Sequence, residues 1–186
     1  YMLPKGFGSM FRLQSLVLNS NKFDTIDGDM LASLVSLTEL DFGSNLIVAL
    51  PKKVCRLTKL TSLNVSDNKI SVVPKEIRSL AAVRVLNLDR NRLTIENAAP
   101  RELAELRNLD ELTLHVNDLS ALPEGLEALP KLRKLTFSHN PCAAQVYDVL
   151  EPYSALRAAC PHLNVSHSHF DAPEADGDED RSKRAR

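Results

Sequence analysis

The chain has 186 residues, of which 44% are hydrophobic and 25% are charged, as expected for an ordinary globular protein of one domain. Its formal net charge of −1 provides no long-range field to attract nucleic acid or an anionic membrane, so we do not expect direct nucleic-acid binding. No apolar run approaches the roughly 18 residues that a membrane helix needs, which argues against membrane insertion.

The three cysteines, Cys55, Cys142 and Cys160, form an odd set without paired spacing. Such a set is more typical of small buried side chains in a reducing compartment than of a disulfide framework. We therefore expect an intracellular, cytoplasmic protein, with a cytoskeletal or axonemal location included in that expectation.

One frame of residues recurs six times along the chain. It consists of Leu, two variable residues, Leu, one variable residue, Leu or Phe, two variable residues, Asn, one variable residue and an aliphatic residue, with a few substitutions. Successive copies of the Asn are separated by 24, 23, 23, 26 and 23 residues. The near-constant spacing predicts a repeated structural unit. The six asparagines are Asn21, Asn45, Asn68, Asn91, Asn117 and Asn140.

Within each copy, central apolar residues such as Leu63 and Val65 alternate with polar neighbours, which predicts a short strand with one buried face. The Asn amide can donate and accept hydrogen bonds, so its loss should cost about 1–3 kcal/mol. One repeat cannot bury its own apolar residues, so replacing Leu86 or Leu112 by Ala should damage the fold.

A Leu-Pro or Val-Pro pair predicts a turn or short helix on the opposite, convex side, with proline in the turn or at the first helical position. These pairs occur at residues 3–4, 50–51, 73–74 and 122–123.

From Leu3 to Val165 this pattern resembles the leucine-rich-repeat family. The Leu-Pro pairs resemble those of its intracellular class, which includes small-GTPase-binding scaffolds. The resemblance implies an α/β solenoid with a parallel sheet on its concave face and short helices or 3-10 turns on its convex face.

We divide the chain into three parts. Residues 1–142 form six full repeats preceded by a partial one, which leads us to expect further repeats before Tyr1. Residues 143–170 resemble the C-terminal cap of intracellular family members, a Tyr-containing helix followed by a last strand-like segment. That cap normally closes with Leu-Asp, where this chain has Val165-Ser166. Residues 171–186 carry acidic and then basic side chains, which predicts a disordered tail.

The longest step, between Asn91 and Asn117, carries three extra residues within 97–106. Pro100 followed by Leu103 and Leu106 among charged residues predicts a true helix on the convex side. We interpret this insertion as a structural variation rather than a docking element.

Residues that could support chemistry are few. His162, His167 and His169 lack the partners of a metal site, and we expect no metal, cofactor or small-molecule substrate. His115 and His139 fall near the ends of adjacent strands and could lie side by side, but no convincing nucleophile and oxyanion set accompanies them. The sequence therefore favours a protein that is not an enzyme.

The variable residues of each strand are expected to point away from the core, onto the concave face. This face should be rich in small hydrogen-bonding side chains and mildly negative, which suits a protein partner that is basic or part of a large complex. The predicted protein-binding residues are Glu39, Asp41, Asn64, Asn87, Asp89, Glu111, Thr113, His115, Lys134 and Thr136. A competing convex surface, interpreted first as a solvated face but able to dock an acidic partner, holds Lys52, Lys53, Arg56 and Lys59.

Three function classes follow in order. The first is a protein–protein interaction module that acts as a scaffold or regulatory adaptor through its concave sheet. The second is a structural subunit of a large assembly, such as an axonemal or cytoskeletal complex or a ribonucleoprotein particle. An enzyme is third.

Overall fold

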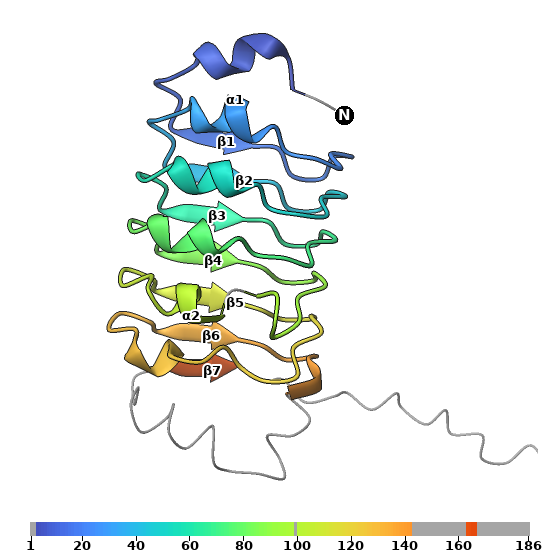
Figure 1. Cartoon of the computed structure of the whole chain (residues 1–186), viewed down its shortest axis with the longest axis vertical. Coiled ribbons are helices and arrows are strands. Elements are labelled where there is room, and N and C mark those ends of the chain that lie inside the picture. The colour runs from blue at the N-terminus through green and yellow to red at the C-terminus, as the bar shows by residue number, and fades with distance from the viewer. Residues whose placement is uncertain (1–2, 99, 143–162, 167–186) are drawn as a thin grey trace, which may run out of the picture.

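The fold is a stack of coils, each contributing one three-residue strand to a single parallel sheet (Figure 1). The computed structural model describes residues 3–98, 100–142 and 163–166. The strands follow one another in sequence order across the sheet, as a solenoid requires. They are β1 (Ser15–Val17), β2 (Glu39–Asp41), β3 (Ser62–Asn64), β4 (Val85–Asn87), β5 (Glu111–Thr113), β6 (Lys134–Thr136) and β7 (Asn164–Ser166).

Short helices lie on the side of the stack opposite the strands (Figure 1). Two are α-helical, α1 (Gly28–Ala32) and α2 (Pro100–Leu103). The others are 3-10 helices, η1 (Lys5–Ser9), η2 (Lys52–Arg56), η3 (Lys75–Ser79) and η4 (Leu126–Ala128). The predicted solenoid, with its sheet on one face and short helices or 3-10 turns on the other, is confirmed.

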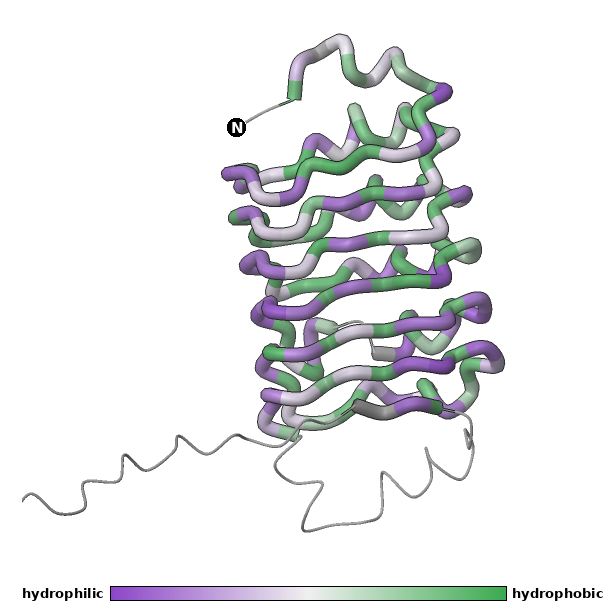
Figure 2. Tube along the Cα trace, turned by 180° about the vertical axis from the view of Figure 1, so that it is seen from behind, coloured by the Kyte–Doolittle hydropathy of each residue, from purple (hydrophilic) through white to green (hydrophobic). Residues whose placement is uncertain are grey.

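The core runs through the whole stack between the sheet and the helices. The central residue of every strand from β2 to β6 is at most 1% exposed. The apolar residue two positions after it in each of these coils, such as Val65 or Leu88, is equally buried. Figure 2 shows the result as hydrophobic positions that recur from coil to coil, with hydrophilic residues gathered at the turns on both sides. Each coil is therefore covered by its neighbours, and the core is collective.

The repeated asparagines form a hydrogen-bonded ladder beside the sheet. The side-chain nitrogen of Asn91 donates to the carbonyls of Val65, Leu88 and Asp89, at 3.0–3.1 Å, and its side-chain oxygen accepts from the Ile70 amide at 2.9 Å. Two of these four partners, Val65 and Ile70, belong to the preceding coil. The prediction that the Asn amide both donates and accepts hydrogen bonds is confirmed.

The residue before each repeat Asn has a positive φ, between 51° and 57°. This left-handed turn aims the following Asn into the stack, and side chains other than glycine adopt it at a cost. The six residues are Ser20, Ser44, Asp67, Arg90, Val116 and His139. The sequence frame gave no sign of this conformation, because these positions share no residue type.

Pro51 and Pro74 immediately precede their helices as N-caps, which agrees with the first of the two positions expected for proline, the turn. Two local features differ from the sequence-based expectations. The helix that begins at Pro100 ends at Leu103, short of Leu106. After Pro123 the helix is delayed by Gly125, whose φ is 86° and where a Cβ would lie 2.9 Å from that of Ala104.

Strand β7 confirms the predicted final strand-like segment, since Asn164 pairs in register with Lys134 of β6. The predicted cap helix within 143–162 and the charged tail from Asp171 onward lie outside the described residues. None of the helices in the described part of the chain has the length and apolar character needed to cross a bilayer.

Candidate functional site: the open face of the sheet

The predicted binding residues lie on the open face of the sheet, which we define as the face turned away from the helices. Strand register aligns them into two columns on either side of the buried leucines. One column contains Ser15, Glu39, Ser62, Val85, Glu111 and Lys134, and the other contains Val17, Asp41, Asn64, Asn87, Thr113 and Thr136. A third set, which follows the strands, includes Asp89 and His115. The tertiary structure therefore gathers all ten predicted residues on one side of the sheet.

Polar side chains at β2 and β3 are linked to each other rather than left free. One carboxylate oxygen of Asp41 accepts from the Gly43 amide at 2.7 Å and from the Asn64 side chain at 3.0 Å. The Asn64 oxygen in turn accepts from the Ser66 amide. A Cβ at Gly43 would lie 3.0–3.3 Å from the side chains of Asn64, Asp41 and Ser66, so the absence of a side chain there leaves room for this network.

A second network crosses from β4 to β6. Asp89 accepts from the main-chain amide of His115 at 2.7 Å, and His115 Nδ1 lies 2.6 Å from Ser138 Oγ. Burial raises the pKa of Asp89 against the opposing effect of the hydrogen bond from the His115 amide. Burial also lowers the pKa of His115, with smaller effects from the Asp89 carboxylate, which raises it, and His139, which lowers it.

His115 and His139 lie side by side, as the sequence predicted, with ring centroids 4.8 Å apart in an edge-to-face arrangement. The Ser138 hydroxyl lies 2.6 Å from His115 Nδ1, but Ser138 is only 5% exposed. Asp89 bonds the main chain of His115 instead of the ring nitrogen that a carboxylate must orient for nucleophilic catalysis. The cluster thus joins three coils and presents no accessible activated hydroxyl.

Thr113 corrects one expectation about this face. It was expected to point into solvent, yet it is only 6% exposed and its hydroxyl donates to Asn87 at 2.7 Å. The hydroxyl satisfies the same Asn87 oxygen that accepts from the Asp89 amide, which explains how a polar side chain is accommodated there. Thr113 therefore supports the face without forming a contact surface.

The side chains left for a partner lie toward both ends of the face. Glu39 and Lys134 are exposed, and Thr136 is half-buried. Lys134 forms an ion pair with Glu111, and Glu39 accepts from Ser15 at 2.7 Å. Because Lys134 offsets Glu111, the carboxylates that remain on the face are Glu39, Asp41 and Asp89, and the first two lie toward the N-terminal end of the sheet.

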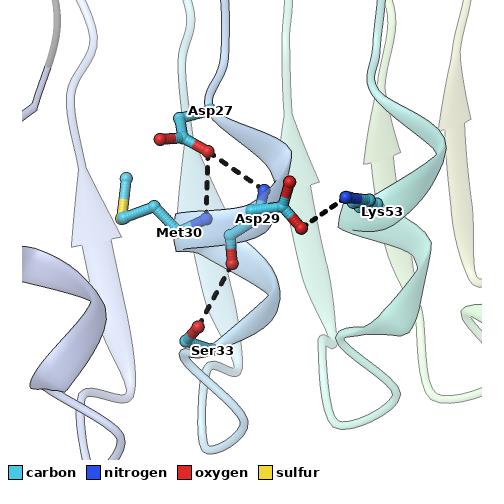
Figure 3. Close-up of polar contacts among 5 residues, drawn as sticks. All are labelled: Asp27, Asp29, Met30, Ser33 and Lys53. Atoms are coloured by element: carbon cyan, nitrogen blue, oxygen red, sulfur yellow. Dashed lines mark hydrogen bonds and ion pairs between the residues drawn. The ribbon is translucent and has the colours of Figure 1, made fainter.

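The convex basic surface is partly neutralised. Figure 3 shows Lys53 of η2 directed at Asp29 of α1, in the preceding coil, where the two form an ion pair. Asp27 caps α1 by accepting from the amides of Asp29 and Met30 at 3.1 and 3.0 Å. Lys53 thus joins neighbouring coils, while the other predicted members of this surface, Lys52, Arg56 and Lys59, are exposed.

Sequence reasoning missed a hollow at the edge where the strands begin. It is lined by Arg84, Asn108, Asp110, Pro130, Lys131 and Arg133. The signal was available, since three of these residues directly precede strands, but the frame treated them as variable positions.

In the described part of the chain no group of three or more His, Cys, Asp or Glu side chains could hold a metal ion. His162, His167 and His169 lie outside that part.

Comparison with known proteins identifies a family with this architecture. The sequence pattern of the family described as "Leucine-rich repeat region" matches residues 3–171. A search of curated protein sequences found no match.

Solved structures with similar folds include proteins of Leptospira interrogans and Arabidopsis thaliana. A leucine-rich-repeat protein of Leptospira interrogans superposes with a TM-score of 0.78 at 30% identity, covering 89% of this chain and 40% of the Leptospira chain. Two ectodomains from Arabidopsis thaliana also match. For the receptor kinase GASSHO1/SCHENGEN3, in complex with CASPARIAN STRIP INTEGRITY FACTOR 2, the TM-score is 0.67 at 29% identity, with 74% of this chain and 17% of that one covered. For the receptor kinase SOBIR1 the TM-score is 0.60 at 32% identity, with 69% of this chain and 71% of that one covered.

This chain spans less than half the length of the first two of these structures. The fold of that family serves generally as a protein–protein interaction module. With the repeat frame, the parallel sheet and the matched residues in agreement, the chain belongs to the leucine-rich-repeat family.

Proposed function

We propose that this protein is a scaffold or regulatory adaptor, without enzymatic activity, that binds a protein partner through the open face of its sheet. The observation that carries the proposal is the continuity of that face. Aligned side chains from successive strands form one preorganised polar surface, held by hydrogen bonds between coils. A surface already fixed in place loses little conformational entropy when a partner binds.

The charge of the face supports a basic partner segment. Glu39 is exposed, and Asp41 stands beside it two residues further along the same strand. Complementary charge of this kind favours association and orientation more than affinity. We propose a cellular location inside the cytoplasm, which the two buried free cysteines, Cys55 and Cys142, support.

The test uses substitutions that change the face and break only one exposed hydrogen bond on it, the bond from Ser15 to Glu39. Asp41 and Asp89 are poor targets because both accept structural hydrogen bonds. We choose Glu39→Lys with Thr136→Lys, which places two bulky cations where a basic partner would bind. The matched control, Glu124→Lys with Thr25→Lys, makes the same chemical changes at exposed residues away from the sheet.

Both variants and the unchanged chain are used to capture partners from native extract, and the captured proteins are identified by mass spectrometry. We expect the sheet-face variant to lose at least about tenfold of its principal partners while the control retains them. Full retention by a correctly folded sheet-face variant removes this face as the binding site. Equal loss of many subunits in both variants would favour the second role, a structural subunit embedded in a large assembly.

A further inference from the structure

The edge of the sheet where the strands begin carries an unbalanced positive charge. We define this strand-start edge as the two residues before and the one residue after the first apolar residue of each frame. Across the six coils it contains one carboxylate, Asp110. Its cations are Arg12, Lys59, Arg84, Arg107, Lys131 and Arg133, and all six are exposed. The chain as a whole has a net charge of −1, so this edge departs from the average of the molecule.

The charge is concentrated at the hollow between the coils of β4, β5 and β6. The hollow has a volume of about 630 Å³ and is lined by Arg84, Asn108, Asp110, Pro130, Lys131 and Arg133. In Figure 2 this edge is one of the two sides on which hydrophilic residues gather at the turns. Its size is within the usual range of binding clefts, about 300–1,000 Å³.

Hydrogen bonds between coils hold the walls of the hollow. The Asn108 side chain donates to the carbonyl of Ala81 in the preceding coil at 2.8 Å and accepts from Lys131 of the following coil at 2.6 Å. Arg107 donates to the carbonyl of Ala128 at 3.0 Å. These contacts position Lys131 and Arg107 without neutralising them, because an amide and a carbonyl carry no net charge.

Most of the positive charge therefore remains available. Arg133 forms an ion pair with Asp110, at 3.6 Å, and the Arg133 side chain is 79% exposed. An exposed pair of this length is weak and can exchange for a better partner. Arg84 and Arg133 also offer guanidinium forks that suit carboxylates.

We propose that this hollow binds an extended acidic segment, rich in Asp and Glu, of a partner protein. Neighbouring coils are about 4.8 Å apart at the sheet, so three or four extended residues span the distance from Arg84 to Arg133. The site is separate from the open face of the sheet and does not depend on the function proposed for that face.

The lining favours an acidic peptide over nucleic acid. Single-stranded nucleic acid is usually bound by aromatic side chains on which the bases stack, together with a cationic groove. The described lining of this hollow contains no aromatic residue on which a base could stack. The guanidinium groups of Arg84 and Arg133 can each bind a carboxylate side chain through two hydrogen bonds, and this needs no stacking surface.

The test measures binding of fluorescein-labelled octaglutamate to the full chain by fluorescence polarisation, with labelled octaglutamine as the neutral probe. The site variant is Arg84→Gln, Lys131→Gln and Arg133→Gln. The matched control, Lys22→Gln, Lys69→Gln and Arg92→Gln, removes three exposed cations from the opposite edge of the sheet. We expect at least about a tenfold loss of octaglutamate affinity in the site variant and less than about twofold in the control.

Equal losses in the two variants, or no loss in either, would overturn the site. Tighter binding of single-stranded oligothymidylate than of octaglutamate, lost in the same site variant, would assign the hollow to nucleic acid instead. The chain's own acidic residues at 171–180 are the remaining competitor. If neutralising them raises octaglutamate affinity, the occupant is that segment and the assignment to a separate partner is wrong, whereas unchanged affinity supports the partner.

Discussion

At the scale of single residues, the turn after each strand imposes the same backbone conformation on six unlike side chains. Small or polar residues such as Ser44 and Asp67 tolerate the left-handed region comparatively well. Val116, with a φ of 53°, does not, because its branched Cβ crowds the neighbouring carbonyl. The strain is retained because the turn must direct Asn117 into the ladder, where it bonds the carbonyls of Leu88 and Leu114.

Replacing Val116 by Asn should therefore stabilise the protein. We expect the free energy of unfolding to rise by about 1 kcal/mol, since Asn adopts a positive φ more readily. Denaturant unfolding measures the change. The control is Val72→Asn, an exposed valine without a positive φ, where the change should stay within about 0.5 kcal/mol. Equal effects at the two positions would show that backbone strain at Val116 is not the cause.

At the scale of the structural elements, side chains that follow the strands connect β4, β5 and β6. Asp89, His115 and Ser138 come from three successive coils and are linked in one chain of hydrogen bonds. The sequence indicated that His115 and His139 could be neighbours, because they occupy equivalent places in adjacent repeats. It could not indicate which groups bond the histidine, because that depends on how far each coil is displaced from the next.

The lowered pKa of His115 makes the stability of this region depend on pH. A depressed histidine pKa means that folding favours the neutral ring, so its contribution to stability is present above the ordinary value of 6.5 and is lost as the pH falls below it. We expect the free energy of unfolding to fall between about pH 7 and about pH 5, and His115→Gln to reduce that fall.

Denaturant unfolding at several pH values checks this expectation. The charged neighbours of His115 are Asp89, His139 and Arg90. Asp89 cannot imitate the loss, because its raised pKa has the opposite sign: its contribution is greatest at low pH and is lost as the pH rises. An identical pH dependence in the variant and the unchanged chain would exclude His115 as the titrating group.

At the scale of the whole molecule, the contribution of a repeat Asn to stability depends on its place in the stack. Asn91, in the middle, is 8% exposed and makes four hydrogen bonds, two of them to the preceding coil. Asn21, in the first coil, is exposed, and its side chain donates to the carbonyls of Leu18 and Asn19, which belong to its own coil. The repeat Asn therefore contributes more hydrogen bonds between coils in the middle of the stack than in the first coil.

Alanine at these two positions should reveal the difference. Asn91→Ala leaves buried carbonyls and an amide without partners, so we expect a loss of about 3 kcal/mol in the free energy of unfolding. Asn21→Ala should cost about 1 kcal/mol or less, because water can replace its bonds. Thermal and denaturant unfolding provide the values. Comparable losses would mean that the ladder does not stabilise the stack through contacts between coils.

The sequence by itself determined the solenoid, the order and approximate place of its strands, and the ladder of asparagines, because each follows from a residue type repeated at fixed spacing. It also placed the ten predicted residues on one face, since strand alternation fixes the side on which a residue lies. Only the tertiary structure decided that Thr113 is buried, that the polar side chains of the face bond one another, and that Arg84, Lys131 and Arg133 border one hollow. These properties arise between coils about 23 residues apart, where the distances depend on how the whole stack packs.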